Sequence, residues 1–147
     1  MAAITLIAVG KLKESFYAQA CAEYEKRLQA FGGVRVVELP EGKSRAAEAT
    51  AIRAKIPKGA WLGAFTPEGK KYSSEGFAAL LEKTEMSGRP RCFLIGSSEG
   101  IDPSLKAQAD AQISVSDMTF PHHLFRVMAL EQLYRARSIS AGGKYHK

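Results

Sequence analysis

The sequence predicts a single α/β domain built on a mostly parallel sheet with helices on both faces. Short runs of apolar and β-branched residues alternate along the chain with longer segments of helical periodicity, which is the pattern of βαβ units. The first run, residues 3–9, is almost continuously apolar, as in strands buried on both faces. The length of 147 residues, with 46% hydrophobic and 24% charged, suits one globular domain over residues 1–147.

The first half of the chain begins with the strand expected at residues 3–9. Between residues 14 and 31, apolar side chains recur at helical spacing, so this segment is expected to be a helix. Gly32 and Gly33 follow it directly and are expected to end it. The elements expected next are a strand at residues 34–39, an alanine-rich helix at 44–56 ended by Pro57, a strand at 60–65 and a turn at 66–69.

The second half ends in a helix expected at residues 121–138, whose apolar side chains cover most of its circumference. A single stripe cannot bury all of them against one core. The helix is therefore either central to the core or also packed on a second subunit. The other elements expected are a helix at residues 74–86, a strand at 91–95, a short helix that begins at Asp102-Pro103 and a strand at 113–115.

The charge of the chain is unevenly distributed. The formal net charge is +6, but residues 1–121 hold 16 basic and 14 acidic side chains. Residues 122–147 hold five basic side chains against one acidic one, and all three histidines. A basic surface attracts the phosphates of nucleic acids. The C-terminal segment is thus where a polyanion would bind, although a net charge this modest is equally consistent with a basic surface that only keeps the protein soluble.

Neither a membrane span nor a secretory signal is predicted. The longest apolar stretch, residues 1–10, is far shorter than the ~20 residues that cross a bilayer. Lys11 and Lys13 follow this stretch, whereas a signal peptide has its basic residues first. We therefore expect a cytoplasmic protein. Cys21 and Cys92 form no CxxC pair, so neither a disulfide framework nor a zinc site is predicted.

Residues 96–100 read Gly-Ser-Ser-Glu-Gly and fit the GxSxG motif of serine hydrolases, with Ser98 as the nucleophile. In such an enzyme a helix starts directly at the nucleophile. The helix expected from Asp102-Pro103 starts three or four residues too late. A serine hydrolase is kept as an alternative, because possible triad partners follow in the right order. They are Asp102, Asp110 and Asp117, and then His122, His123 and His146.

Two loops are expected to form a ligand-binding cleft at the carboxyl ends of neighbouring strands. Gly96 and Gly100 follow the strand at 91–95, and residues 114–121 follow the strand expected beside it. Open α/β sheets bind ligands at this edge. We expect the backbone at Gly96 to approach a flat ligand closely, because a side chain there would push into the ligand.

The two loops, the last helix and the chain end carry a resemblance to a known family. The segments concerned are residues 93–100, 114–121 with His122, 126–127, 131–136 and 145–147. They resemble the bacterial large-subunit ribosomal RNA methyltransferase H family, of the SPOUT class. The similarity extends weakly over the whole chain and is most specific in the last 55 residues.

The resemblance implies a SPOUT-type α/β domain in which residues 92–147, approximately, form a C-terminal trefoil knot. It implies a homodimer, which would explain the apolar last helix. It also implies methyl transfer from S-adenosyl-L-methionine to N3 of a pseudouridine in helix 69 of 23S rRNA, within the assembled ribosome. Carried over by position, the cofactor would lie against Phe65, Gly96, Val115, Ser116, Asp117, Met118, Thr119 and Phe120.

The reaction indicates what the remaining residues would do. N3 of a uracil-type ring carries a proton that must be removed for methyl transfer, and His146 is the candidate base by its intrinsic pKa. Arg126 or Arg135 could stabilise negative charge on the ring carbonyls. No metal is needed. The residues expected at the reacting base are Tyr145, His146 and Arg126, and those expected on the RNA are Arg135, Lys144 and Lys147.

The chain departs from the family pattern at four positions. Ser97 stands where the family has a second glycine, and Lys144 where it has a proline. Phe65 and Thr66 replace a leucine and an aspartate, and Phe65 keeps an apolar surface for adenine. A noncatalytic RNA-binding module is a further alternative, which binding of S-adenosylmethionine would distinguish from an enzyme.

Overall fold

Five parallel strands form the sheet in the computed structural model, which describes residues 2–147, and their order is β2-β1-β4-β3-β5. Every strand pair is parallel, as the alternation of strands and helices predicted. The fold class expected from the sequence is therefore confirmed. The strands are β1 (Ile4–Val9), β2 (Val34–Leu39), β3 (Trp61–Lys71), β4 (Arg91–Ile95) and β5 (Ala111–Ser114).

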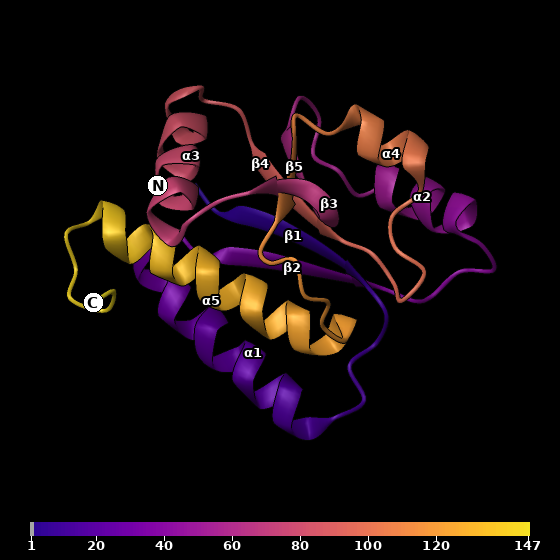
Figure 1. Ribbon diagram of the computed structural model, residues 1–147, viewed down its shortest axis with the longest axis horizontal. Helices are drawn as coiled ribbons and strands as arrows, with labels where there is room; N and C mark the ends of the chain where they lie inside the picture. Colours follow the sequence, from indigo (N-terminus) through magenta and orange to yellow (C-terminus); the bar gives the residue numbers. More distant parts are fainter. Residues whose placement is uncertain (1) are drawn as a thin grey trace.

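Helices cover both faces of the sheet, with α1, α3 and α5 on one face and α2 and α4 on the other (Figure 1). No helix among residues 2–147 is both long enough and apolar enough to cross a membrane. The helices are α1 (Ser15–Leu28), the short 3-10 helix η1 (Gln29–Phe31), α2 (Arg45–Arg53), α3 (Ser74–Met86), α4 (Pro103–Gln108) and α5 (His122–Ser140).

The core is divided by the sheet into two apolar clusters. In β1, Leu6 and Ala8 face α1 and α5, whereas Ile7 and Val9 face α2 and α4. All four side chains are buried, which explains why the strand is apolar without alternation. On α5, Leu130 and Leu133 are fully buried, so the last helix is a core helix. This leaves the second possibility, packing on another subunit, open.

Local signals in the sequence set most helix boundaries. The side chains of Ser44, Ser73 and Asp102 each accept a hydrogen bond from a backbone N–H in the first turn of α2, α3 and α4. Each such cap contributes about 1 kcal/mol. Gly32, at φ 93°, follows η1 in the left-handed conformation that ends a helix. The short helix expected after Asp102-Pro103 is confirmed.

The turn expected at residues 66–69 is wrong, because β3 continues through it to Lys71. Phe65 and Lys70 both pair with Ile113 of β5, so the intervening residues bulge out of the register. Gly69 permits this bulge: a Cβ there would lie 2.5 Å from the backbone carbon of Gln112.

Two further boundaries differ from the expectation. Helix α2 ends at Arg53 rather than at the residue before Pro57, and β5 begins at Ala111 rather than at residue 113. The trefoil knot expected within residues 92–147 concerns the threading of the chain and stays a prediction.

Candidate functional site

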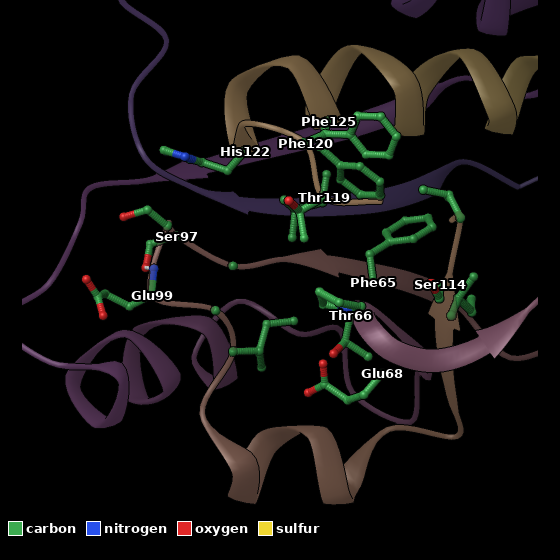
Figure 2. Close-up of a pocket in the computed structure, with 18 of the residues that line it drawn as sticks. Phe65, Thr66, Glu68, Ser97, Glu99, Ser114, Thr119, Phe120, His122 and Phe125 are labelled. Atoms are coloured by element: carbon green, nitrogen blue, oxygen red, sulfur yellow. Dashed lines mark hydrogen bonds between the residues drawn. The ribbon is translucent and has the colours of Figure 1, made fainter. Parts of the chain in front are cut away.

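A cavity of about 480 Å³ lies where the carboxyl ends of β3, β4 and β5 meet the start of α5. Its size is in the range of small-molecule sites. The loops that follow β4 and β5 form its walls, as the sequence predicted (Figure 2). Seven of the eight residues expected to contact a cofactor line it, namely Phe65, Gly96, Val115, Ser116, Met118, Thr119 and Phe120.

Aromatic rings form one end of the cavity. Figure 2 shows Phe65, Phe120 and Phe125 grouped there, opposite Ser97 and Glu99. The Phe65 ring is buried, and its centroid lies 5.3 Å from that of Phe125 in an edge-on arrangement. Such an apolar end accepts a flat aromatic ligand, while the opposite end offers polar groups.

The cavity is lined by both basic and acidic side chains. Arg45, Lys106, Glu68 and Glu99 all line it, and Lys106 pairs with Glu68. Hydrogen bonds from Lys106 and Thr66 lower the pKa of the Glu68 carboxyl. Glu68 is therefore an anion at neutral pH. The cavity can hold a ligand that carries both a cationic and an anionic group.

The loop after β4 requires a glycine at position 96. A Cβ at Gly96 would lie 2.8 Å from the carbonyl carbon of Gly100 and 2.8 Å from Cγ1 of Ile101. The loop therefore excludes a side chain at Gly96 by itself, and the expected close approach of Gly96 to a ligand stays a prediction. The missing Cβ points into the folded-back loop, where Ser97 and Gly100 form a β-bridge.

Glu48 of α2 holds the loop that follows β4 through hydrogen bonds. Its Oε1 accepts a hydrogen bond from Ser97 Oγ at 2.9 Å, and its Oε2 accepts one from the Gly42 N–H at 3.0 Å. Ser97 Oγ also accepts from the Glu99 N–H at 3.3 Å. Sequence reasoning missed Glu48, and no local signal in the alanine-rich helix could have identified it. The hydroxyl of Ser97 thus holds the loop in place.

Asp117 is the one expected cofactor residue that does not line the cavity. Its carboxylate pairs with Lys71, and 82% of its side chain is exposed. Residues 114–121 are therefore split between the cavity wall and the solvent. His122, which was not among the expected cofactor residues, does line the cavity.

His122 and His123 lie together at the start of α5, with ring centroids 4.1 Å apart. Burial, and next the charge of His123, lower the pKa of His122, so the ring is neutral at pH 7. Its Nε2 lies 3.6 Å from a carboxylate oxygen of Glu41 and has no hydrogen-bond partner among residues 2–147. His123 contacts Glu14 at 3.1 Å. Both rings lie close to Gly10, where a Cβ would come within 3.1 Å of His122 Nε2 and 3.4 Å of His123 Nε2, in keeping with a structural role.

Arg126 is not brought to the cavity. Its side chain is 4% exposed, and its guanidinium donates to Glu38 Oε2 at 2.6 Å and to the Gly10 carbonyl oxygen. It thus ties α5 to the ends of β1 and β2. The guanidinium is committed to these contacts, so the structure does not support the catalytic role expected for Arg126.

The end of the chain folds back on α5 and α3. Tyr145 donates to Glu131 Oε2 at 2.7 Å, and Arg135 donates to the same carboxylate. His146 Nδ1 lies 2.9 Å from Arg135 Nη1, and His146 Nε2 lies 2.6 Å from Glu75 Oε1. Because Arg135 can only donate, Nδ1 is the acceptor and Nε2 carries the proton.

The structure therefore brings Tyr145, His146 and Arg135 together, but it does not bring them to the cavity of the same chain. None of the three lines it. Lys144 and Lys147 are exposed beside them.

Ser98 lines the cavity, but it does not stand at a nucleophile elbow, because α4 begins only at Pro103. Within residues 2–147, no hydrogen bond joins Ser98 to a histidine. The geometry around Ser98 therefore offers no support for the hydrolase.

Within residues 2–147, no group of three or more His, Cys, Asp or Glu side chains could hold a metal ion.

Comparisons with known proteins agree with this geometry. The family model described as "Predicted SPOUT methyltransferase" matches residues 2–146. Two curated relatives carry the name ribosomal RNA large subunit methyltransferase H. The one from Desulfotalea psychrophila is 42% identical and covers 97% of each chain. The one from a Synechococcus species is 44% identical and covers 99% of this chain and 95% of its own.

A solved structure shares the fold. The SpoU methyltransferase AviRb from Streptomyces viridochromogenes, crystallised with AdoMet, aligns with a TM-score of 0.50 at 14% identity. The alignment covers 97% of this chain and 59% of AviRb, so this chain spans little more than half of that protein. At this identity the likeness concerns the fold alone. On the strength of the family match and the full-length relatives, the chain belongs to the SPOUT methyltransferase family.

Proposed function

We propose that the cavity binds S-adenosyl-L-methionine and that the protein methylates the RNA of the large ribosomal subunit. The observation that carries this proposal is the cavity itself, formed by seven of the expected cofactor residues. The names of the full-length relatives support the RNA substrate, and AviRb was solved with the same cofactor.

The residues present fit this cofactor. The apolar end around Phe65 and Phe125 suits the adenine ring. Among the charged residues that line the cavity, Glu68 and Glu99 suit an ammonium group, and Arg45 suits a carboxylate. When bound, S-adenosylmethionine supplies a methyl group on a positively charged sulfur, and that sulfur keeps the bonding electron pair when the methyl leaves.

We propose further that the acceptor is N3 of a pseudouridine in helix 69 of 23S rRNA, in the assembled ribosome, and hence that the protein acts in the cytoplasm. The N3 proton passes to a base as the N3–carbon bond forms. His146 Nδ1 is the atom that can take it, once Arg135 releases the contact of 2.9 Å. Tyr145, Lys144 and Lys147 would position the RNA beside it.

The distance of the chain end from its own cavity supports a homodimer. In a dimer, Tyr145 and His146 of one copy would reach the cavity of the other copy. The interface would also cover Met118 and Val115, which are exposed at the cavity. Sedimentation is expected to give twice the chain mass of 16.0 kDa. A monomer at micromolar concentration would contradict a site shared between copies.

The activity is tested on ribosomes that lack the modification. Incubation with the protein and methyl-labelled S-adenosylmethionine, followed by digestion of the RNA and mass spectrometry, is expected to yield 3-methylpseudouridine. A chain ending at Gly143 is expected to bind the cofactor normally but to transfer no methyl, and His146→Ala to slow transfer by ~10²-fold. Label on another nucleotide, or none, would refute the assignment.

The two alternatives are separated by simple measurements. Reaction of Ser98 with a fluorophosphonate probe would favour the serine hydrolase. Failure to bind S-adenosylmethionine, with RNA binding retained, would favour the noncatalytic RNA-binding module.

A further inference from the structure

A second cavity, of about 370 Å³, adjoins the first and has no part in the function proposed above. It lies between the start of α3 and the middle of α5. Val127 and Met128 line it from α5, and Ser73 and Ser74 line it from α3. The two cavities have wall residues in common, namely Phe65, Ile113, Ser114 and Val115.

The lining of this second cavity selects against an anion. Among the described residues that form it there is no lysine, arginine or histidine. Its one acid, Glu131, already accepts from Tyr145 and Arg135. The walls instead present the rings of Phe77, Tyr24 and Tyr72. A neutral planar ring fits these walls, since aromatic side chains stack on nucleobases of any type.

Two neutral polar side chains, Ser74 and Gln132, line the cavity and can form hydrogen bonds with the edge of such a ring. Ser74 Oγ donates to Gln132 Oε1 at 3.0 Å, and Gln132 Nε2 donates to Glu131 at 3.1 Å. A hydroxyl and a carboxamide together can donate to ring carbonyls and accept from ring N–H groups. Uracil-type bases present both kinds of group side by side.

The residues expected to act on the acceptor are tied to the same two helices. Glu75, next to Ser74 in the chain, holds His146, and Glu131, next to Gln132, holds Tyr145. Within one chain, the candidate base and the second cavity are therefore held by the same two helices, α3 and α5. In the dimer proposed above, the chain end that meets a base bound in this cavity comes from the other copy.

We propose that the second cavity receives the acceptor base, a uracil-type ring turned out of the RNA, with Gln132 and Ser74 contacting its carbonyl and N–H edge. This inference rests on the proposed function, since the ligand of the first cavity is taken to be the methyl donor. The cost of unstacking the base, a few kcal/mol, would be offset by stacking on the aromatic walls.

Methionine methyl groups offer a direct test, because Met118 lines the first cavity, Met128 lines the second, and Met86 is 85% exposed on α3. The protein is labelled with [methyl-¹³C]methionine and observed by NMR. S-adenosylhomocysteine is expected to shift the Met118 signal. Pseudouridine 5′-monophosphate, added next at millimolar concentration, is expected to shift the Met128 signal and to leave Met86 unchanged.

Variants and control nucleotides make the test specific. Gln132→Leu is expected to lower the affinity for pseudouridine monophosphate, read from the Met128 shift, by about 5- to 10-fold, as for one lost hydrogen bond. Ser74→Ala is expected to lower this affinity as well. The control Gln19→Leu changes an exposed glutamine of α1 and is expected to have no effect. Cytidine monophosphate, which lacks the N3–H, is expected to shift Met128 less.

Each outcome has a distinct meaning. If S-adenosylhomocysteine shifts no signal, the proposed function fails. If it shifts Met118 but pseudouridine monophosphate leaves Met128 unchanged, the inference alone is overturned. A Met128 signal that responds to protein concentration instead of nucleotide would show that a second copy of the chain fills the cavity, which also overturns it.

Discussion

Replacing Arg126 with methionine is expected to destabilise the fold without weakening cofactor binding. The guanidinium is buried and joins Glu38 and the Gly10 carbonyl oxygen. A hydrogen bond that involves a charged group contributes about 1.5–3 kcal/mol. Since the side chain of Glu38 is 37% exposed, water can replace part of the loss. We therefore expect a cost of about 2 kcal/mol, or about 4–8 °C in Tm for a chain of this length.

Thermal denaturation measures this cost, and Glu38→Gln provides the second arm of a double-mutant cycle. Burial raises the pKa of Glu38, but hydrogen bonds from Arg126 and the Leu12 N–H outweigh it and hold the pKa below its ordinary value. Stability from a carboxyl with a lowered pKa is present above the unfolded-state pKa and is lost as the pH falls through the folded one. The cost of Arg126→Met should therefore shrink below about pH 4.

Normal Tm with abolished methyl transfer would refute this reasoning. It would mean that the guanidinium leaves its buried contacts to act on the substrate, as the sequence suggested. Reduced Tm with unchanged affinity for S-adenosylhomocysteine, measured by calorimetry, is the result that the contacts predict.

Three other changes probe the loops and the core. Gly96→Val is expected to lower stability by about 1–3 kcal/mol, because its side chain meets Gly100; an unchanged Tm would contradict this. Glu48→Gln is expected to weaken cofactor binding while changing Tm little, since the carboxylate holds Ser97 of the loop. Normal affinity for the cofactor would show that this contact is dispensable. Burial raises the pKa of Cys21 to about 11 and of Cys92 to about 12, so iodoacetamide at pH 8 should alkylate neither until the protein is unfolded.

The fold could be predicted because its signals are local. Periodicity, caps and the glycines after α1 are read within a few residues of the element they define. The position of the cavity followed from a general rule about the carboxyl ends of parallel strands. Bulged β3 was missed because a Pro-Glu-Gly sequence is usual in turns, and its pairing with Ile113 and Ser114 of the distant β5 keeps it extended.

The parts of the site that could not be predicted depend on contacts between distant segments. Glu48 and Ser97 are 49 positions apart, and Arg126 and Glu38 are 88 apart. No residue close to any of them in the sequence indicates which distant side chain it contacts. Asp117 could not be placed either, because its neighbours in the same loop line the cavity while its own carboxylate turns to Lys71.

The most direct test of the central claim is a calorimetric titration of the protein with S-adenosyl-L-methionine. One site per chain is expected, with binding lost in a variant that fills the cavity from its exposed wall, Thr119→Trp, and retained in the chain that ends at Gly143. Binding in the wild type that survives Thr119→Trp in a folded protein would place the cofactor elsewhere. No binding at all would contradict the assignment of the cavity and, with it, methyl transfer by this chain.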